Sequence, residues 1–165
     1  PGPRRPGPAG AGMSDARWLE IDAAVASAIH HFAGAAEIFD RFPTASGTER
    51  YLVEMAFMHA MQAAHTSLEN ALLRILELCG EEAPTGRQWH ADLIRRAARD
   101  VDGRPAILVG EVAEAADETR QFRNVAARSY DNFNERKAAP AVAASRLLAH
   151  ALPKAIARFR QAIDP

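Results

Sequence analysis

Residues 48–79 have the sequence TERYLVEMAFMHAMQAAHTSLENALLRILELC, which contains neither proline nor glycine. Side chains recur in it at intervals of three and four residues, the spacing of one face of a helix. On this face we place Leu52, Met55, His59, Ala63, Thr66, Asn70 and Leu73. A wide apolar face near the C-terminal end adds Leu68, Leu72, Ile75, Leu76 and Cys79. Ser46 or Thr48 can cap the first turn and Gly80 fits the closing position, so the stretch predicts one long amphipathic helix.

The segment that precedes this helix also carries a helical stripe. Ser14 is a plausible N-cap for it. The stripe consists of Trp18, Ile21, Val25, Ile29 and Phe32. Pro43 and Gly47 mark the break between the two segments. We therefore predict two long helices that are joined by a short turn.

Three more helices are predicted in the second half of the chain. One covers residues 89–101 and stops at an Asp-Gly pair, and the next covers residues 106–130. The buried stripe of the latter is Val109, Val112, Ala113 and Ala116. The last helix starts near Pro140, because proline is tolerated in a first turn, and Pro153 should kink it. Its apolar positions are Val142, Leu147, Leu148, Ile156 and Phe159.

These patterns predict an all-α fold, an antiparallel up-down bundle of about five helices. No stretch shows the sustained alternation of a strand, and no repeat of 20–50 residues is present. Residues 1–13 are rich in proline and glycine and lack the apolar core of a signal peptide. We expect them to be a disordered tail or an expression remnant, and residues 14–165 to form the bundle.

The composition excludes several classes of function. Twenty basic and 21 acidic residues give a net charge of −1, which excludes a globally basic nucleic-acid binder but not a local basic patch. The single cysteine excludes an internal disulfide. The histidines lack the spacing of a helical metal pair, so we expect no metal and no other cofactor. No apolar run approaches the ~20 residues of a membrane span, and we expect a cytoplasmic protein without membrane association.

Arginines gather near the end of the predicted fourth helix, in residues 120–130 with the sequence RQFRNVAARSY. Arg123 and Tyr130 are separated by about 700° of helix rotation, so they share a face to within about 20°, and Arg120 shares a stripe with Ala127. Guanidinium groups match phosphate oxygens in a bidentate manner, and a phenol can stack or donate a hydrogen bond. The segment therefore predicts a local anion site. A solvated helix end, where cations favour the helix dipole, explains the same pattern.

Residues 123–130, RNVAARSY, resemble the RN-x3-H-x-Y signature of HEPN domains, in particular of HepT-like ribonuclease toxins. Three further segments resemble parts of that family in the same order. They are HTSLEN (65–70) with Ile75-Leu76 in the second helix, WHADLI (89–94) at the opening of the third, and RPAIL (104–108) at the start of the fourth. The resemblance spans roughly residues 14–162.

The resemblance implies an antiparallel helical bundle that forms a homodimer with a composite site at the dimer interface. It also implies metal-independent RNA cleavage, in which the 2′-hydroxyl attacks the adjacent phosphate. Such toxins pair with a small nucleotidyltransferase antitoxin that can adenylylate the signature tyrosine, which is Tyr130 here. The implied catalytic residues are Arg123, Arg128 and Asn124, and the implied RNA-phosphate ligands are Arg120, Arg123, Arg128 and Tyr130.

Arg128 occupies the position of the signature histidine. Histidine can accept and return a proton near neutral pH, whereas arginine stays protonated and has no acceptor. Loss of a general base typically costs about 10²–10⁴ in rate. Arg128 can still stabilise the phosphate in the transition state, although it lies about 140° around the helix from Arg123. Either His90 or His65 can replace the base chemically, but nothing in the sequence places them at this segment.

Three functions remain open at this point. The first is a toxin of a toxin–antitoxin pair, an endoribonuclease by descent whose activity is weakened or lost at Arg128. The second is a non-catalytic HEPN module that binds RNA, nucleotide or a nucleotidyltransferase antitoxin through the same face. The third is a helical bundle without a role in nucleic-acid chemistry.

Overall fold

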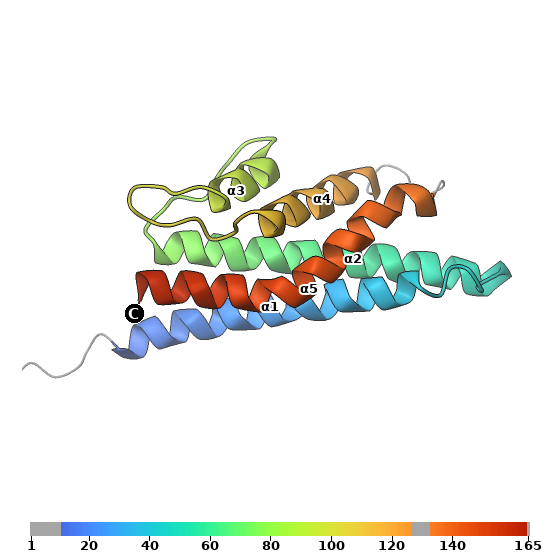
Figure 1. Cartoon of the computed structure of the whole chain (residues 1–165), viewed down its shortest axis with the longest axis horizontal. Coiled ribbons are helices and arrows are strands. Elements are labelled where there is room, and N and C mark those ends of the chain that lie inside the picture. The colour runs from blue at the N-terminus through green and yellow to red at the C-terminus, as the bar shows by residue number, and fades with distance from the viewer. Residues whose placement is uncertain (1–10, 127–132, 165) are drawn as a thin grey trace, which may run out of the picture.

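The computed structural model describes residues 11–126 and 133–164, and this part of the chain is almost entirely helical. Its helices are α1 (Ala11–Phe39), α2 (Gly47–Leu78), α3 (Trp89–Ala97), α4 (Glu111–Ala126) and α5 (Glu135–Ile163). Along the chain, α1, α2, α4 and α5 alternate in direction, and the short α3 lies beside α4 over α2 (Figure 1). The described residues contain no strand, only an isolated bridge between Val101 and Arg104. The predicted all-α up-down bundle is confirmed.

The buried face of α2 is not the first face that the sequence suggested. That prediction was wrong, because Leu52, His59, Thr66 and Asn70 are exposed. The second predicted face is confirmed, and packing extends it toward the N-terminus through larger apolar side chains. The buried apolar positions of α2 include Val53, Phe57, Met61, Ala64, Leu68, Leu72, Ile75 and Leu76. Both faces have helical spacing, and the face that carries fewer polar groups is the one that packs against α1 and α4.

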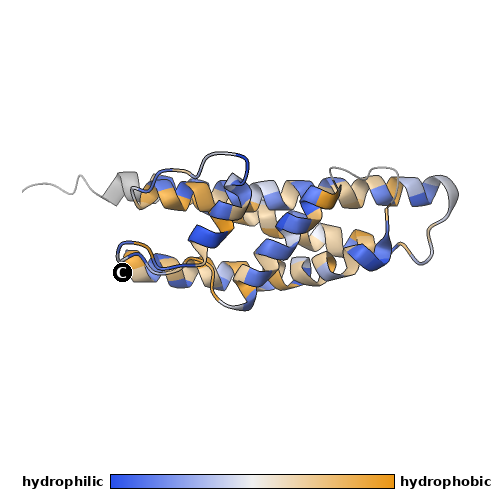
Figure 2. Ribbon diagram, turned by 90° about the horizontal axis from the view of Figure 1, so that it is seen from above, coloured by the Kyte–Doolittle hydropathy of each residue, from blue (hydrophilic) through white to orange (hydrophobic). Residues whose placement is uncertain are grey.

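The core consists of two apolar clusters that follow each other along the bundle. The larger one joins the stripe predicted for α1 to α2, α3 and α5. Its largest members include Trp18, Phe32, Leu68, Leu72 and Phe159. The second cluster is aromatic, with the ring of Phe42 stacked 4.8 Å from that of Phe133. Figure 2 views the side on which α3 and α4 lie, and these short helices present mainly hydrophilic residues there.

Several helix ends differ from the predictions for local reasons. α1 begins at Ala11, before the expected cap at Ser14. α2 closes at Gly80 as predicted: its φ is 75°, and the Glu81 N–H donates to the Leu76 carbonyl at 2.9 Å. α5 begins at Glu135 and not at Pro140, since the Asn134 side chain accepts from two backbone N–H groups of the first turn.

The segment between α3 and α4 is not helical, in contrast to the prediction. α3 ends at Ala97, and α4 starts at Glu111. Ile107 and Leu108 are buried in the intervening segment, and both of their N–H groups donate to the Ala97 carbonyl, at 2.8 and 3.1 Å. Val109, predicted to be buried, is 42% exposed. These contacts attach the segment to the end of α3.

The buried side chain of Arg104 holds this segment in place. Its guanidinium pairs with Glu81 and donates to the carbonyls of Pro105 at 2.9 Å and of Arg96 and Arg99 at 3.3 Å. Arginine can satisfy so many acceptors at once because it has five N–H donors in a planar group. Arg104 therefore fixes the orientation of α3, which the site described below requires.

Replacing Arg104 by alanine should lower the free energy of unfolding by about 2 kcal/mol, because the half-buried Glu81 carboxylate and three backbone carbonyls lose the guanidinium that donates to them. Urea denaturation measures this change. Arg74→Ala is the matched control, since Arg74 forms an exposed pair with Glu20 and its loss should cost at most about 1 kcal/mol. Equal effects of the two substitutions would contradict the role of Arg104.

Candidate active site

A buried polar network joins α2 to α4. His65 and Glu69 lie one turn apart on α2, and Thr119 lies on α4; the side chains of all three are at least 97% buried. A carboxylate only accepts hydrogen bonds, so His65 donates to Glu69 Oε1 through Nε2, over 3.1 Å. The other ring nitrogen, Nδ1, pairs with the Thr119 hydroxyl at 3.1 Å. Both nitrogens of His65 are thus used inside the protein.

His90 extends this network to the surface. It lies in the first turn of α3, where its Nδ1 donates to the same carboxylate oxygen, Glu69 Oε1. The ring of Trp89 stacks on that of His90 with centroids 3.7 Å apart. Because Nδ1 carries the donated proton, the lone pair of a neutral His90 resides on Nε2. Glu69 and Trp89 therefore determine both the tautomer and the orientation of this imidazole.

Arg123 of α4 lies against His90 and Glu69. Its Nη1 is 3.0 Å from His90 Nδ1, 3.3 Å from His90 Nε2 and 3.6 Å from Glu69 Oε2, so the guanidinium lies against the side of the imidazole that carries both nitrogens. The side chains of His90 and Arg123 are 24% and 28% exposed, whereas that of Glu69 is 3% exposed. The carboxylate thus orients the two groups from below, and these two groups are accessible to a ligand.

Glu69 remains ionised in this environment. Burial by itself raises the pKa of a carboxyl group. The hydrogen bonds and charges of His65 and His90 outweigh that effect, and the pKa of Glu69 lies below its ordinary value. A negative charge is therefore held beneath the imidazole of His90 near neutral pH.

The groups of the network that reach the surface open into a hollow of about 380 Å³ between α2, α3 and the end of α4. We call it the Arg123 hollow; it is lined by Gln62, Thr66, His90, Arg123 and Asn124. It combines a guanidinium, two amides, a hydroxyl and an imidazole. Such a set can hold an anion by charge-assisted hydrogen bonds and can transfer a proton beside it.

Two of the residues that the sequence singled out, Arg123 and Asn124, line this hollow together. Arg120 lines a separate hollow between α3 and α4, where its Nε pairs with Asp117 Oδ1 at 2.7 Å. Arg128 and Tyr130 lie outside the described residues. No metal-binding cluster of three or more His, Cys, Asp or Glu residues occurs in residues 11–126 and 133–164.

The sequence analysis named His90 as a chemical replacement for the base but did not place it at the site, and it left Glu69 out. Both lie in the segments 65–70 and 89–94 that carried the family resemblance. However, 21 residues separate Glu69 from His90 and 33 separate His90 from Arg123, and helical periodicity relates only residues of the same helix. The family resemblance of residues 65–70 and 89–94 was the available signal for Glu69 and His90. Only the tertiary structure shows that these residues meet Arg123.

An up-down helical bundle with an Arg-Asn pair near the end of its fourth helix is the arrangement that the sequence resemblance predicted for a HEPN-type domain. A family model described as HepT-like protein matches residues 56–163, well over half of the chain. The chain therefore belongs to the HepT-like family, and the match includes every residue of the Arg123 hollow. No curated protein and no solved structure matches the chain. Within the part of the chain that the structure describes, no helix is long and apolar enough to span a membrane.

Proposed function

We propose that this protein is a metal-independent endoribonuclease of toxin type that cleaves RNA in the Arg123 hollow. The observation that carries the proposal is the contact between the guanidinium of Arg123 and the imidazole of His90, both accessible and both placed against the buried Glu69 carboxylate. A phosphate binder and a proton acceptor side by side are the two groups that cleavage by a neighbouring hydroxyl requires.

In the proposed reaction, Arg123 and the Asn124 amide hold the scissile phosphate. His90 Nε2 accepts the proton of the 2′-hydroxyl, whose oxygen then attacks phosphorus. The bond from O2′ to phosphorus forms and the bond from phosphorus to O5′ breaks, so the products are a 2′,3′-cyclic phosphate and a 5′-hydroxyl. The protonated imidazole returns its proton to the leaving oxygen, which balances the step without a metal.

His90 also supplies a candidate for the general base that is missing at Arg128. Arginine cannot act as the base, but an imidazole lies within hydrogen-bonding distance of Arg123 in the same protomer. Arg128 is then free to contribute charge alone. This arrangement favours catalysis over the alternative of a non-catalytic HEPN module.

The proposal includes the partners that family membership supports. These are a second copy of the chain and a small nucleotidyltransferase antitoxin that modifies Tyr130, in a cytoplasmic toxin–antitoxin pair. Val125 follows Asn124 of the Arg123 hollow and is 53% exposed, an apolar surface that a second copy can cover.

Incubation of the purified protein with single-stranded RNA in EDTA tests the activity. We expect cleavage at the same rate with and without the chelator, products that end in a 2′,3′-cyclic phosphate, and no cleavage where the 2′-hydroxyl is methylated. Arg123→Ala should lower the rate at least tenfold, because a charged hydrogen bond to phosphate is lost. RNA that binds without being cleaved would instead indicate a binding module, and inhibition by EDTA would exclude the metal-independent reaction.

A further inference from the structure

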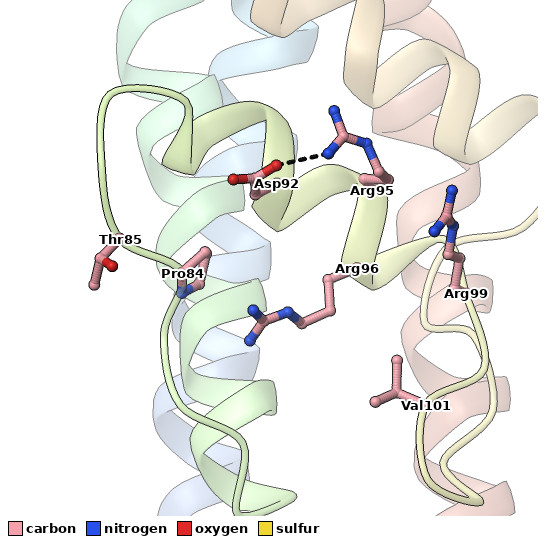
Figure 3. A pocket seen from close by; sticks show the side chains of 7 residues that line it. All are labelled: Pro84, Thr85, Asp92, Arg95, Arg96, Arg99 and Val101. Atoms are coloured by element: carbon pink, nitrogen blue, oxygen red, sulfur yellow. Dashed lines mark hydrogen bonds and ion pairs between the residues drawn. The ribbon is translucent and has the colours of Figure 1, made fainter.

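A second hollow, of about 470 Å³, lies on the outer side of α3 (Figure 3). We call it the α3 arginine hollow; its lining comprises Pro84, Thr85, Asp92, Arg95, Arg96, Arg99 and Val101. The three arginines come from the last turn of α3 and the residues just after it, and the loop that precedes α3 forms the opposite wall. It is separate from the Arg123 hollow, because the two share no lining residue.

The positive charges of this hollow are only partly neutralised. Arg95 pairs with Asp92, the single acidic residue in the lining, at 2.7 Å. Arg96 donates a hydrogen bond to the backbone carbonyl of Glu82. A carbonyl group has no net charge and does not neutralise the guanidinium. Within the residues that the structure describes, the guanidinium of Arg99 has neither an ion pair nor a hydrogen bond. Two of the three arginines therefore lack a carboxylate partner, in a chain whose overall charge is almost balanced.

Arginines near a helix C-terminus are favoured by the helix dipole, but that effect does not bring them to one hollow. Three guanidinium groups that line one hollow, two of them without a carboxylate partner, match a ligand with several anionic oxygens, and they match phosphate oxygens in particular. Arg95 and Arg99 are exposed and Arg96 is half-buried, so the guanidinium groups of the hollow are accessible to a solvated backbone. Its chemistry thus fits the phosphates of a nucleic-acid strand.

A row of arginines connects this hollow to the proposed cleavage site. Arg95 lines both the α3 arginine hollow and the neighbouring hollow between α3 and α4. Arg120 also lines that neighbouring hollow, one helical turn before Arg123 on α4. The neighbouring hollow also contains Glu114 and Asp117, and Asp117 pairs with Arg120. A strand held at Arg123 can therefore reach the α3 arginine hollow along α3 and α4, where Arg96 and Arg99 are the arginines without a carboxylate partner.

We propose that the α3 arginine hollow binds backbone phosphates of an RNA strand, at a distance from the phosphate that is cleaved. This inference rests on the proposed function for the identity of the ligand, RNA. The contacts go to phosphates and not to bases, so the hollow adds affinity and orientation without adding sequence preference.

The test compares Arg96→Ala/Arg99→Ala with the parent in binding a 2′-O-methyl oligoribonucleotide of about 12 nucleotides, which binds without being cleaved. Loss of two contacts should weaken binding about tenfold near 0.1 M salt and reduce the slope of log K against log salt by about 1.4, or 0.7 per contact. Arg17→Ala/Lys154→Ala removes the same charge from exposed positions on α1 and α5 and should change neither quantity appreciably. Circular dichroism verifies that all variants are folded.

Cleavage assays separate this inference from the proposed function. The double variant should raise KM for a long RNA while leaving the cleavage rate of a dinucleotide unchanged, because a dinucleotide is too short to reach α3. If the protein cleaves no RNA but Arg96→Ala/Arg99→Ala still binds the oligoribonucleotide more weakly, the α3 arginine hollow is an RNA-binding site and the nuclease proposal is wrong. Unchanged binding and slope in the double variant would overturn the inference, as would equally tight binding of polyglutamate, which would indicate an acidic protein partner.

Discussion

Replacing His90 by alanine should lower the rate of single-stranded RNA cleavage by about 10²–10⁴-fold, the usual contribution of a general base. The reason is geometric, since Glu69 accepts a hydrogen bond from Nδ1–H, which leaves the lone pair of the neutral imidazole on Nε2, beside Arg123. Binding of a 2′-O-methyl oligoribonucleotide should change less than threefold, because Arg123 and Asn124 remain. Single-turnover cleavage and titration measure the two quantities separately.

The controls for this prediction are a substitution of one other histidine and a second substitution of His90. His150→Ala removes an exposed histidine of α5 and should leave cleavage unchanged. His90→Asn preserves a donor for Glu69 but cannot accept a proton, so it should be as slow as the alanine variant. Parental rates in both His90 variants would show that another group is the base.

Replacing Glu69 by glutamine should reduce both stability and activity. The carboxylate is buried against His65, His90 and Arg123, and breaking such a cluster costs about 3 kcal/mol of unfolding free energy at pH 7. Cleavage should fall by about 10²–10⁴, since an amide no longer determines the tautomer of His90. Urea denaturation and single-turnover cleavage measure the two effects.

The stability difference should depend on pH in a defined direction. Burial opposes the ionisation of Glu69, but the two histidines lower its pKa below the ordinary value of 4.5. A carboxyl group with a lowered pKa in the folded chain contributes stability that is complete above its ordinary pKa and is lost as the pH falls through the folded value. The difference in unfolding free energy between the parent and Glu69→Gln should therefore become smaller below about pH 4.5.

Glu77→Gln provides the matched control for Glu69. Glu77 lies on the same helix and is exposed, so its substitution should change the unfolding free energy by less than about 0.5 kcal/mol at any pH. If Glu69→Gln behaves in the same way as this control, the carboxylate does not organise the site.

The sequence predicted the class of fold because that depends on local spacing. The stripe from Trp18 to Phe32 and the closure at Gly80 are visible along a single helix, and both are confirmed. The wrong face was predicted for α2 because two faces of that helix have helical spacing and packing selects between them. The wrong start was predicted for α5 because the cap at Asn134 begins the helix before Pro140. Such choices depend on residues that are distant in the chain.

The sequence predicted only part of the candidate site. Arg123 and Asn124 are adjacent, so the sequence could propose them together. His90 meets Arg123 through the fold alone, after Glu69 and the Arg104 contacts have positioned α3. Arg128 and Tyr130 stay predictions, as does the part that Arg120 plays in RNA binding.

One carboxylate of α2 organises groups from α3 and α4, and this has a consequence for synthesis of the chain. A ribosome-bound polypeptide that has emerged only as far as α3 contains Glu69 and His90 but not Arg123. Under the proposed function it is harmless to the messenger RNA from which it is being translated. Under the same proposal, the site is complete only when the fourth helix has been made and has docked.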